Sequence, residues 1–374
     1  SPTPSTTPTP ESTPISVQKK ATPAARKQPN IKPTMQSTEV PAIEEDPIVI
    51  LGRPEATQIS LNLFSANGKT VTIRYQSEDG KSSGSSPSIQ LEARVPKIVT
   101  LSDLLPDTSY LYEIVEAGMP INSHRFHTQR PIGSSFTFTI DADPHNRDPR
   151  FDQALYLTTL SNALKDQPDF HINLGDTFMT EKGTPASYEE AASTFTDMLP
   201  YFGTLNADTP LFLVNGNHEG ELGWLLNRGK SPNLPIWSTQ LRQAYFPVPS
   251  ADGFYSGSLT PDPTLDSPRD SYYAWNWGDA LFIVLDPFWY ILDKPKIESD
   301  PDNWYWTLGA DQYDWLKHTL QDSQAPYKFV FIHNLVGGLE LEGSARGGIE
   351  AADLYEWGGN NLDGTDGFAM NRPG

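Results

Sequence analysis

Residues 170–176 are Phe-His-Ile-Asn-Leu-Gly-Asp, a short apolar-rich run that ends in a glycine and a carboxylate. The run has the length and residue types of a buried β-strand, and Gly175 lets the backbone turn sharply where the strand ends. Asp176 is then expected at the mouth of the strand, pointing over the edge of a sheet. Because a lone Gly-Asp pair is typical of an ordinary turn, its meaning depends on what surrounds it.

Three further polar motifs stand in the same position relative to a strand-like run. In chain order they are Asp143-Pro144-His145 after Phe136–Ile140, Gly216-Asn217-His218-Glu219 after Leu211–Val214, and His333 after Lys328–Ile332. Carboxylate, imidazole and amide oxygen are ligands of hard or borderline divalent cations. Together the four motifs predict a metal site at the carboxyl edge of an α/β sheet.

The first motif places a carboxylate and an imidazole two residues apart. Pro144 biases Asp143 toward an extended conformation, and side chains at i and i+2 of an extended chain share a side. Asp143 and His145 are therefore expected to reach one cation. On its own, the motif is more typical of a polar loop after a strand.

The third motif separates two roles. The Asn217 carbonyl is a neutral hard ligand, whereas His218, pointing elsewhere, is suited to donate a proton. His333 taken alone is typical of a satisfied histidine at a strand end. The order and equivalent placement of the four motifs favour a metal site over four unrelated structural explanations.

The rest of residues 134–374 also indicates an α/β domain, because predicted strands alternate with predicted helices. Helices are expected over residues 150–165, 187–199 and 308–321, with a capping box formed by Ser187 and Glu190, and a hairpin over residues 272–285. Residues 221–270 are expected to be an irregular insertion, and residues 337–374 a glycine-rich loop.

Residues 47–131 carry strand signals only. Six or seven short runs of alternating polarity in about 85 residues predict a small all-β sandwich in front of the α/β domain. Residues 104–112, where a tyrosine follows a turn that contains a proline, resemble the corner between strands E and F of fibronectin type III domains.

Residues 1–46 are rich in Pro, Thr and Ser, and they cannot bury enough surface to offset the entropy cost of ordering. We expect a disordered linker or stalk, with a surface tether and a tail without a role as equal alternatives. The sequence has no initiator Met or signal segment at Ser1 and no strand or helix pattern at Gly374, so both ends are expected to be cut.

Composition excludes several classes of protein. The net charge of −20 repels nucleic acid and anionic lipid, so no nucleic acid polymer is expected as a partner. The absence of cysteine excludes disulfides, cysteine-ligated zinc and phosphatases with a thiolate nucleophile. No run reaches the ~20 apolar residues of a transmembrane helix. A chain without thiols fits an extracytoplasmic location: secreted, periplasmic or tethered to a surface.

The ordered set of Asp-x-His, Gly-Asp, Gly-Asn-His-Glu and a strand-end His resembles the calcineurin-like metallophosphoesterase superfamily. The preceding β-sandwich resembles the N-terminal domain of purple acid phosphatases, and the two resemblances cover residues 47–374. They imply a four-layer αββα sandwich and two metal ions, divalent or mixed divalent and trivalent, from among Fe, Zn and Mn. They imply His218 beside the leaving group. The implied ligands are Asp143 and His145 on one metal, Asp176 as the bridge, and Asn217 and His333 on the other metal.

Two features depart from this family pattern. The motif Gly-His-x-His, which supplies one more ligand to each metal, does not occur in residues 334–374. The domain is therefore expected to be truncated, and residues 1–374 alone to bind metal poorly. The residues after Asp176 include no Tyr before Tyr188, so the ferric-tyrosinate centre of purple acid phosphatases is not expected.

The expected activity is hydrolysis of phosphate mono- or diesters, with a metal-bridging hydroxide as nucleophile and His218 as proton donor to the leaving oxygen. One alternative is a non-enzymatic cell-surface binding protein with a vestigial metal site. Another keeps hydrolysis but takes nucleotide or lipid phosphodiesters as substrates, a choice that depends on residues 221–270 and 337–374.

Other residues have a structural interpretation beside a functional one. His171 is expected to be structural, and Asp141 and Asp286 to support the metal ligands from strand ends. Arg346 is a candidate contact for a phosphate oxygen. Packing onto the sheets is favoured over a stacking platform for a sugar or base at five tryptophans: Trp275, Trp277, Trp289, Trp304 and Trp306.

Overall fold

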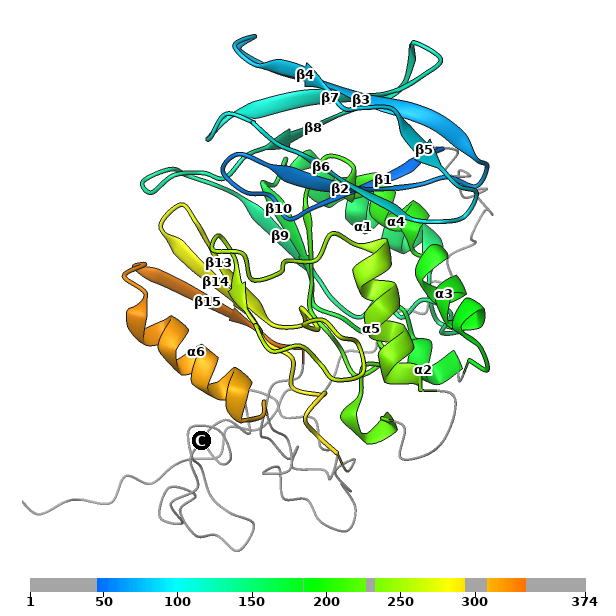
Figure 1. Cartoon of the computed structure of the whole chain (residues 1–374), viewed down its shortest axis with the longest axis vertical. Helices are drawn as coiled ribbons and strands as arrows, with labels where there is room; N and C mark the ends of the chain where they lie inside the picture. Colours follow the sequence, from blue (N-terminus) through cyan, green and yellow to red (C-terminus); the bar gives the residue numbers. More distant parts are fainter. Residues whose placement is uncertain (1–45, 184, 227–232, 293–307, 334–374) are drawn as a thin grey trace, which may run out of the picture. The chain divides into compact units, whose positions relative to one another are not determined.

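The computed structural model describes residues 46–183, 185–226, 233–292 and 308–333, and Figure 1 labels its elements. The predictions for the N-terminal tail, for residues 337–374 and for Arg346, Trp304 and Trp306 lie outside the described residues. None of the described helices is long and apolar enough to cross a membrane.

The first eight strands form two antiparallel sheets packed face to face. One sheet has the order β1 (Ile48–Gly52), β2 (Ile59–Phe64) and β6 (Lys97–Leu101). The other contains β3 (Lys69–Ser77), β4 (Ser83–Ser85), β5 (Ile89–Leu91), β7 (Ser109–Glu116) and β8 (Met119–His127). The inward-facing apolar residues of both sheets form one core. The prediction of an all-β sandwich is confirmed.

Tyr110 makes the contact expected at the strand corner. Its hydroxyl accepts a hydrogen bond of 2.8 Å from the backbone N–H of Leu105, and its ring stacks on Phe126 with centroids 5.3 Å apart. A tyrosine that bonds the backbone a few residues upstream is the tyrosine corner of such sandwiches. The geometry therefore agrees with the likeness of residues 104–112 to that corner.

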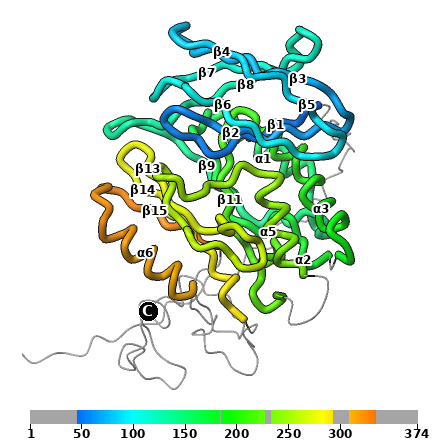
Figure 2. The backbone as a smooth tube through the Cα atoms, in the orientation of Figure 1, coloured from blue at the N-terminus to red at the C-terminus, as the bar shows by residue number. Residues whose placement is uncertain are grey.

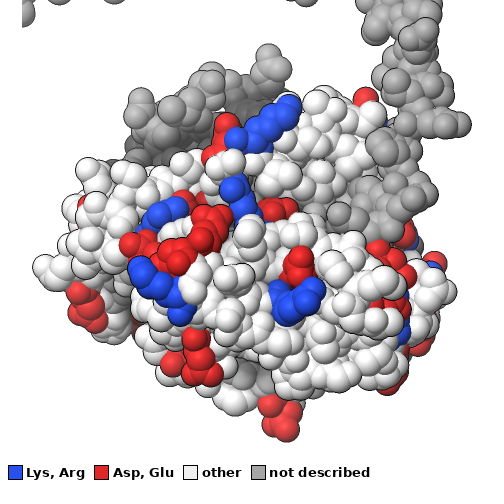
Figure 3. Space-filling model, turned by 90° about the horizontal axis from the view of Figure 1, so that it is seen from above, with Lys and Arg blue, Asp and Glu red and all other residues white. Residues whose placement is uncertain are grey.

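Several charged side chains on the sandwich are paired with a side chain of opposite sign. Arg74 lies 2.9 Å from Glu113, and Lys69 lies 3.1 Å from Asp46 and 3.5 Å from Glu116. Figure 3, which views the molecule from above relative to Figure 1, shows basic and acidic side chains side by side. Surface pairs of this kind contribute about 0–1 kcal/mol each, so the apolar core holds the sandwich together more than they do.

The remaining strands form two further sheets. In one, β9 (Phe138–Asp141), β10 (Phe170–Asn173) and β11 (Leu211–Leu213) are parallel. The other has the order β12 (Ser256–Gly257), β13 (Tyr273–Trp277), β14 (Ala280–Val284) and β15 (Tyr327–Phe331). β13 and β14 form the predicted hairpin, and β15 runs parallel to β14.

The described helices fall between these strands. In chain order they are α1 (Gln153–Lys165), α2 (Thr180–Gly183), α3 (Tyr188–Thr196), α4 (Leu199–Asn206), the 3₁₀ turn η1 (Gly223–Leu225), α5 (Leu234–Tyr245) and α6 (Ala310–Asp322). Figures 1 and 2 show α1, α3, α4 and α5 on one side of the two sheets and α6 on the other.

Alternation along the strands sorts their side chains between layers, because successive residues of a strand point to opposite faces. In β11, Phe212 packs between the two sheets while Leu211 and Leu213 pack among the helices. In β14, Phe282 packs between the sheets while Leu281 and Ile283 pack against α6. The order helix, sheet, sheet, helix confirms the predicted αββα sandwich.

Two predicted features of the α/β region are wrong. Residues 221–270, expected to be irregular, contain α5, which has Pro235 in its first turn and buries Ile236 and Leu241. Proline suits a first turn, where its missing N–H has no helical partner, so the Pro-rich composition masked a helix start. The helix expected over 187–199 ends at Thr196, and α4 follows as a separate helix.

The predicted capping box is half formed. The Ser187 side chain accepts a hydrogen bond of 3.1 Å from the backbone N–H of Glu190, as expected of an N-cap. The Glu190 carboxylate instead accepts from the backbone N–H of Ala186, at 2.8 Å.

The described tryptophans of the predicted platform are buried. Trp275 and Trp277 are 1% and 0% exposed and pack between the sheets, so the stacking interpretation is wrong for both. Trp289 is also buried, and the Arg269 guanidinium lies 3.5 Å over its ring.

Candidate metal centre

The loops that follow β9 and β10 run side by side. The backbone N–H of Asp143 donates to the Gly175 carbonyl, and that of His145 donates to the Asp176 carbonyl, each at 3.0 Å. These two bonds fix the first motif against the second. The carboxyl ends of two neighbouring parallel strands thus bring three candidate ligands to one edge of the sheet.

The first motif reaches this position by a backbone conformation that the sequence did not predict. Asp143 and His145 have φ of +56° and +53°, in the left-handed region, so the expected extended conformation is wrong. Their side chains nevertheless converge, because the His145 Nε2 atom lies 3.3 Å from Asp143 Oδ1 and 3.4 Å from Asp176 Oδ2. Left-handed residues other than glycine are uncommon and gather at functional sites.

Glycine is required where the second and third motifs touch. A Cβ atom on Gly175, whose φ is +94°, would lie 2.4 Å from the Gly216 nitrogen. A Cβ atom on Gly216 would lie 2.3 Å from the Asp176 nitrogen. Since real Cβ atoms do not approach so closely, the two glycines allow the two loops to meet as the sequence predicts for Gly175.

Glu219 joins the same two loops, a role that sequence reasoning missed. Its carboxylate accepts hydrogen bonds from the backbone N–H groups of Asp176 at 2.9 Å, Thr177 at 2.5 Å and Gly216 at 2.6 Å. Burial, together with the nearby Asp176 carboxylate, raises the pKa of Glu219 to about 7. Without the Glu219 carboxylate, these three N–H donors on two loops would lack acceptors. Glu219 therefore holds the second and third motifs together.

His333 is oriented by a backbone carbonyl. Its Nδ1 atom donates to the Leu174 carbonyl at 2.7 Å, which leaves Nε2 to face Asp176 Oδ2 at 3.3 Å. Burial lowers the pKa of His333, but the Asp176 carboxylate outweighs burial and raises it to about 9. Ligation needs the neutral imidazole, so a cation bound here has to displace a proton.

His218 faces the same carboxylate but is held by a different partner. Its backbone N–H donates to Asp176 Oδ1 at 2.8 Å, and its Nδ1 atom lies 3.1 Å from Glu181 Oε2 on α2. Its Nε2 atom lies 3.8 Å from Asp176 Oδ2, farther than either His145 or His333. Sequence reasoning missed Glu181, which lies five residues after Asp176 with no motif to mark it.

These residues fit a bound cation. Ligand atoms of Asp143, His145 and Asp176 all lie within 4.8 Å of one another. The His145 Nε2 atom is buried and has no hydrogen-bond partner within the described residues. This nitrogen is therefore available to bind a metal ion. His333 approaches the same Asp176 oxygen as His145. The half-buried Asn217 stands between Gly216 and His218, whose backbone N–H groups bond Glu219 and Asp176.

A buried polar network supports the Asp176 turn from within the sheet. Asn173 accepts hydrogen bonds from the Gly175 N–H at 3.2 Å and the Thr177 hydroxyl at 2.7 Å. The Asn173 amide donates to Asp141, whose carboxylate also lies 3.0 Å from His171 Nε2. His171 is buried and bonded, as expected of a structural histidine, and Asp141 holds Asn173 beside the Asp176 turn.

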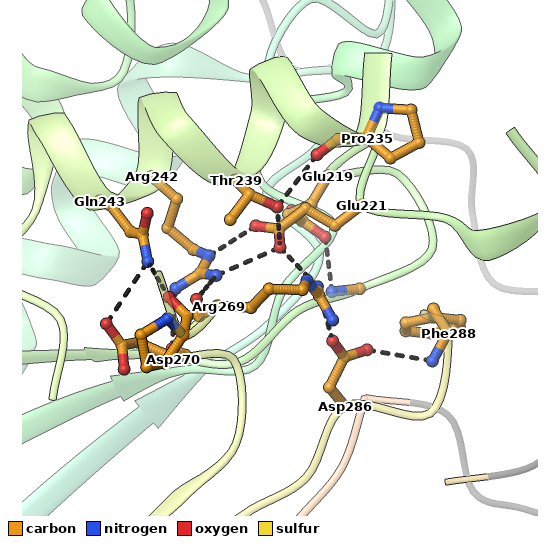
Figure 4. Close-up of polar contacts among 12 residues, drawn as sticks. Glu219, Glu221, Pro235, Thr239, Arg242, Gln243, Arg269, Asp270, Asp286 and Phe288 are labelled. Carbon is orange, nitrogen blue, oxygen red and sulfur yellow. Dashed lines mark hydrogen bonds and ion pairs between the residues drawn. The ribbon is translucent and has the colours of Figure 1, made fainter. Parts of the chain in front are cut away.

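A buried ion network follows the third motif directly, as Figure 4 shows. The Glu221 carboxylate accepts hydrogen bonds from Arg242 Nε at 2.5 Å and from Arg269 Nη2 at 2.8 Å. Burial alone would raise the pKa of the Glu221 carboxyl, but the charges of Arg242 and Arg269 outweigh burial and lower it to about 2.

Acid is expected to weaken the fold through Glu221. Because its folded pKa lies below the ordinary value of 4.5, its stabilisation is present above pH 4.5 and is lost as pH falls toward 2. The difference between the folded and the ordinary pKa of Glu221 corresponds to on the order of 3 kcal/mol of folding free energy. Unfolding free energies measured across this window should fall less steeply for Glu221→Gln than for the unchanged protein. Glu189→Gln, which changes an exposed carboxyl, is the control and should show the same dependence of unfolding free energy on pH as the unchanged protein. If Glu221→Gln also showed that dependence, the loss of stability in acid could not be assigned to Glu221.

Comparison with known proteins agrees with this arrangement. The sequence pattern of the calcineurin-like phosphoesterase family matches residues 136–359. A solved structure of PhoD superposes with a TM-score of 0.55 at 17% identity, covering 78% of this chain and 63% of that chain. A structure of purple acid phosphatase PPD1 from yellow lupin (Lupinus luteus) seeds superposes with a TM-score of 0.52 at 14% identity, covering 78% of this chain and 51% of that chain.

The two superpositions show that the folds are similar and nothing more, because both sequence identities are low. The chain spans 63% and 51% of the lengths of these two structures. No match to the chain is found among the curated proteins.

Proposed function

Because the chain belongs to the calcineurin-like phosphoesterase family, we propose that it hydrolyses phosphate mono- or diesters with two metal ions. The observation that carries the proposal is the convergence on one carboxylate. The Nε2 atoms of His145 and His333 lie 3.4 Å and 3.3 Å from the same Asp176 oxygen, and each comes from a different strand end. A carboxylate that two imidazoles from different strand ends approach suits a bridge between two cations.

Each cation would have its own set of ligands from this chain. Asp143 and His145 would hold one, Asn217 and His333 would hold the other, and Asp176 would serve both. When bound, the two cations would stabilise charge on a phosphoryl group and activate a water molecule. Fe, Zn and Mn all accept this mixture of oxygen and nitrogen donors.

His218 is the proposed proton donor to the leaving oxygen. The Glu181 carboxylate can only accept, so its contact at 3.1 Å keeps a proton on Nδ1 of His218. Nε2 then faces the site and can carry the second proton. The imidazole that carries a proton on both nitrogens is the form that acts as general acid.

Hydrolysis that depends on metal tests this proposal. The full-length protein, loaded with Mn²⁺ or Zn²⁺, is expected to hydrolyse p-nitrophenyl phosphate or bis(p-nitrophenyl) phosphate. EDTA should reduce the rate to background, and added metal should restore it. A rate that EDTA leaves unchanged would contradict the metal-dependent mechanism.

The alternative function is a non-enzymatic binding protein on the cell surface with a vestigial metal site. Stoichiometric metal without hydrolysis of either ester would favour that alternative. We propose an extracytoplasmic location for either function, since a chain without cysteine has no thiol that an oxidising environment could modify. The ratio of rates on the two esters would separate a monoesterase from a diesterase.

A further inference from the structure

Arg269 connects two loops that lie far apart in the sequence. Its Nη2 atom donates to Glu221 Oε2 at 2.8 Å and to Asp286 Oδ2 at 3.0 Å. The three side chains are 8%, 2% and 1% exposed. Figure 4 shows the Arg269 side chain lying between the two carboxylates. Buried charge pairs of this kind are sensitive to the loss of either partner.

One end of this connection holds the loop of the third motif. Glu221 lies four residues after Asn217 and two after Glu219, whose carboxylate accepts a hydrogen bond from the Asp176 N–H. The backbone beyond Glu221 is held as well, because the Gly223 N–H donates to the Phe288 carbonyl at 3.1 Å. A shift of Glu221 would therefore be transmitted to the loop that carries Asn217.

The other end supports the strand end that carries His333. The Asp286 carboxylate accepts from the Phe288 N–H at 3.0 Å, and the Phe288 ring packs beside the His333 ring with centroids 6.2 Å apart. The preceding residue, Leu285, donates its N–H to the Phe331 carbonyl at 2.9 Å. The position of Asp286 is therefore tied to that of His333.

Arginine suits this place better than another cation. A guanidinium group presents several donors in one plane and stacks on aromatic rings, whereas an ammonium is a single point charge. The guanidinium carbon of Arg269 lies 3.5 Å from the centroid of the Trp289 ring, which fixes its plane. Arg242 also binds Glu221, but its other hydrogen bonds go to the carbonyls of Asp270 and Arg269.

We infer that Arg269 is a positioning residue for the second metal: it sets the spacing between the Asn217 loop and His333 by bridging Glu221 and Asp286. The inference rests on the proposed function, in which Asn217 and His333 share one cation. Asp143 and His145 make none of these contacts, so the first metal should not depend on Arg269.

The test is the binding of Mn²⁺ by the full-length protein, measured by equilibrium dialysis and metal analysis. In Arg269→Met one of the two sites, the proposed site of Asn217 and His333, is expected to lose about 10- to 100-fold in affinity, the usual cost of losing an outer partner of a metal ligand. The other site should keep its affinity. Arg269→Lys keeps the charge but reaches one carboxylate at a time, so it should recover part of the lost affinity. If Arg269→Met does not fold, the affinities of Arg269→Lys test the inference instead.

Arg130→Met is the matched control, because Arg130 also pairs with a buried carboxylate, Asp169 at 2.6 Å, but is not among the described partners of Glu221, Asp286 or Arg269. It should lower the thermal unfolding midpoint while the ratio of the two affinities stays as in the unchanged protein. Equal weakening of both sites in the Arg269 variants, or the same ratio change in Arg130→Met, would overturn the inference. Absence of any bound Mn²⁺ in the unchanged protein would instead count against the proposed function itself.

Discussion

Asp176→Asn is expected to abolish metal binding and phosphoesterase activity together. The Asp176 carboxylate faces His145, His218 and His333 at 3.4, 3.8 and 3.3 Å, so it stands at the centre of the proposed site. Two cations that share a bridge repel one another, and the negative charge of the bridge offsets that repulsion. The neutral amide keeps the shape but removes this charge, so both ions should be lost. Metal analysis of the purified variant, beside its rate on p-nitrophenyl phosphate, measures the effect.

Two further variants make this result specific. Asp143→Asn touches only the first proposed ligand set and should leave one metal per chain. Asp197→Asn removes an exposed partner of Arg147 and should keep both metals and full activity. Two retained metals per chain in Asp176→Asn would show that this carboxylate is not the bridge.

The sequence predicted the site best at positions where the local geometry admits one residue type only. Gly175 precedes a carboxylate at a strand end, and the fold requires a glycine there because a Cβ atom would lie 2.4 Å from the Gly216 nitrogen. The alternation of apolar residues predicted the sheets for a similar reason, because each strand has to fill two layers. Local pattern and tertiary packing agree at these places.

The sequence predicted less where long-range contacts decide the conformation. Asp143 takes a φ of +56° because its backbone bonds the Gly175 carbonyl, and this contact overrides the extended bias from Pro144. Glu219, Glu181 and Arg269 carry no local pattern that separates them from other charged residues. Their roles become evident only when residues that are 37 to 48 positions apart bind one another.

His218→Asn is expected to keep the metals while lowering kcat by about 10²- to 10⁴-fold on esters with poor leaving groups, the usual contribution of a general acid. Nε2 of His218 lies 3.8 Å from Asp176 Oδ2, and its Nδ1 is already engaged by Glu181 at 3.1 Å. The loss should shrink for p-nitrophenyl phosphate, because nitrophenolate leaves without help from a proton. Rates on an alkyl and a nitrophenyl ester, with metal content measured on the same samples, separate proton transfer from ligation.

Glu181→Gln gives this prediction its matched variant, because it leaves His218 in place and removes only the charge of the carboxylate that contacts its Nδ1 atom. We expect a smaller loss than in His218→Asn, with the same dependence on the leaving group and with both metals retained. An equal loss on both esters would assign His218 to binding the phosphoryl group, since an imidazolium that only binds has no preference among leaving groups. Loss of a metal in His218→Asn would make His218 a ligand, although Nε2 of His145 and of His333 both lie closer to Asp176 Oδ2.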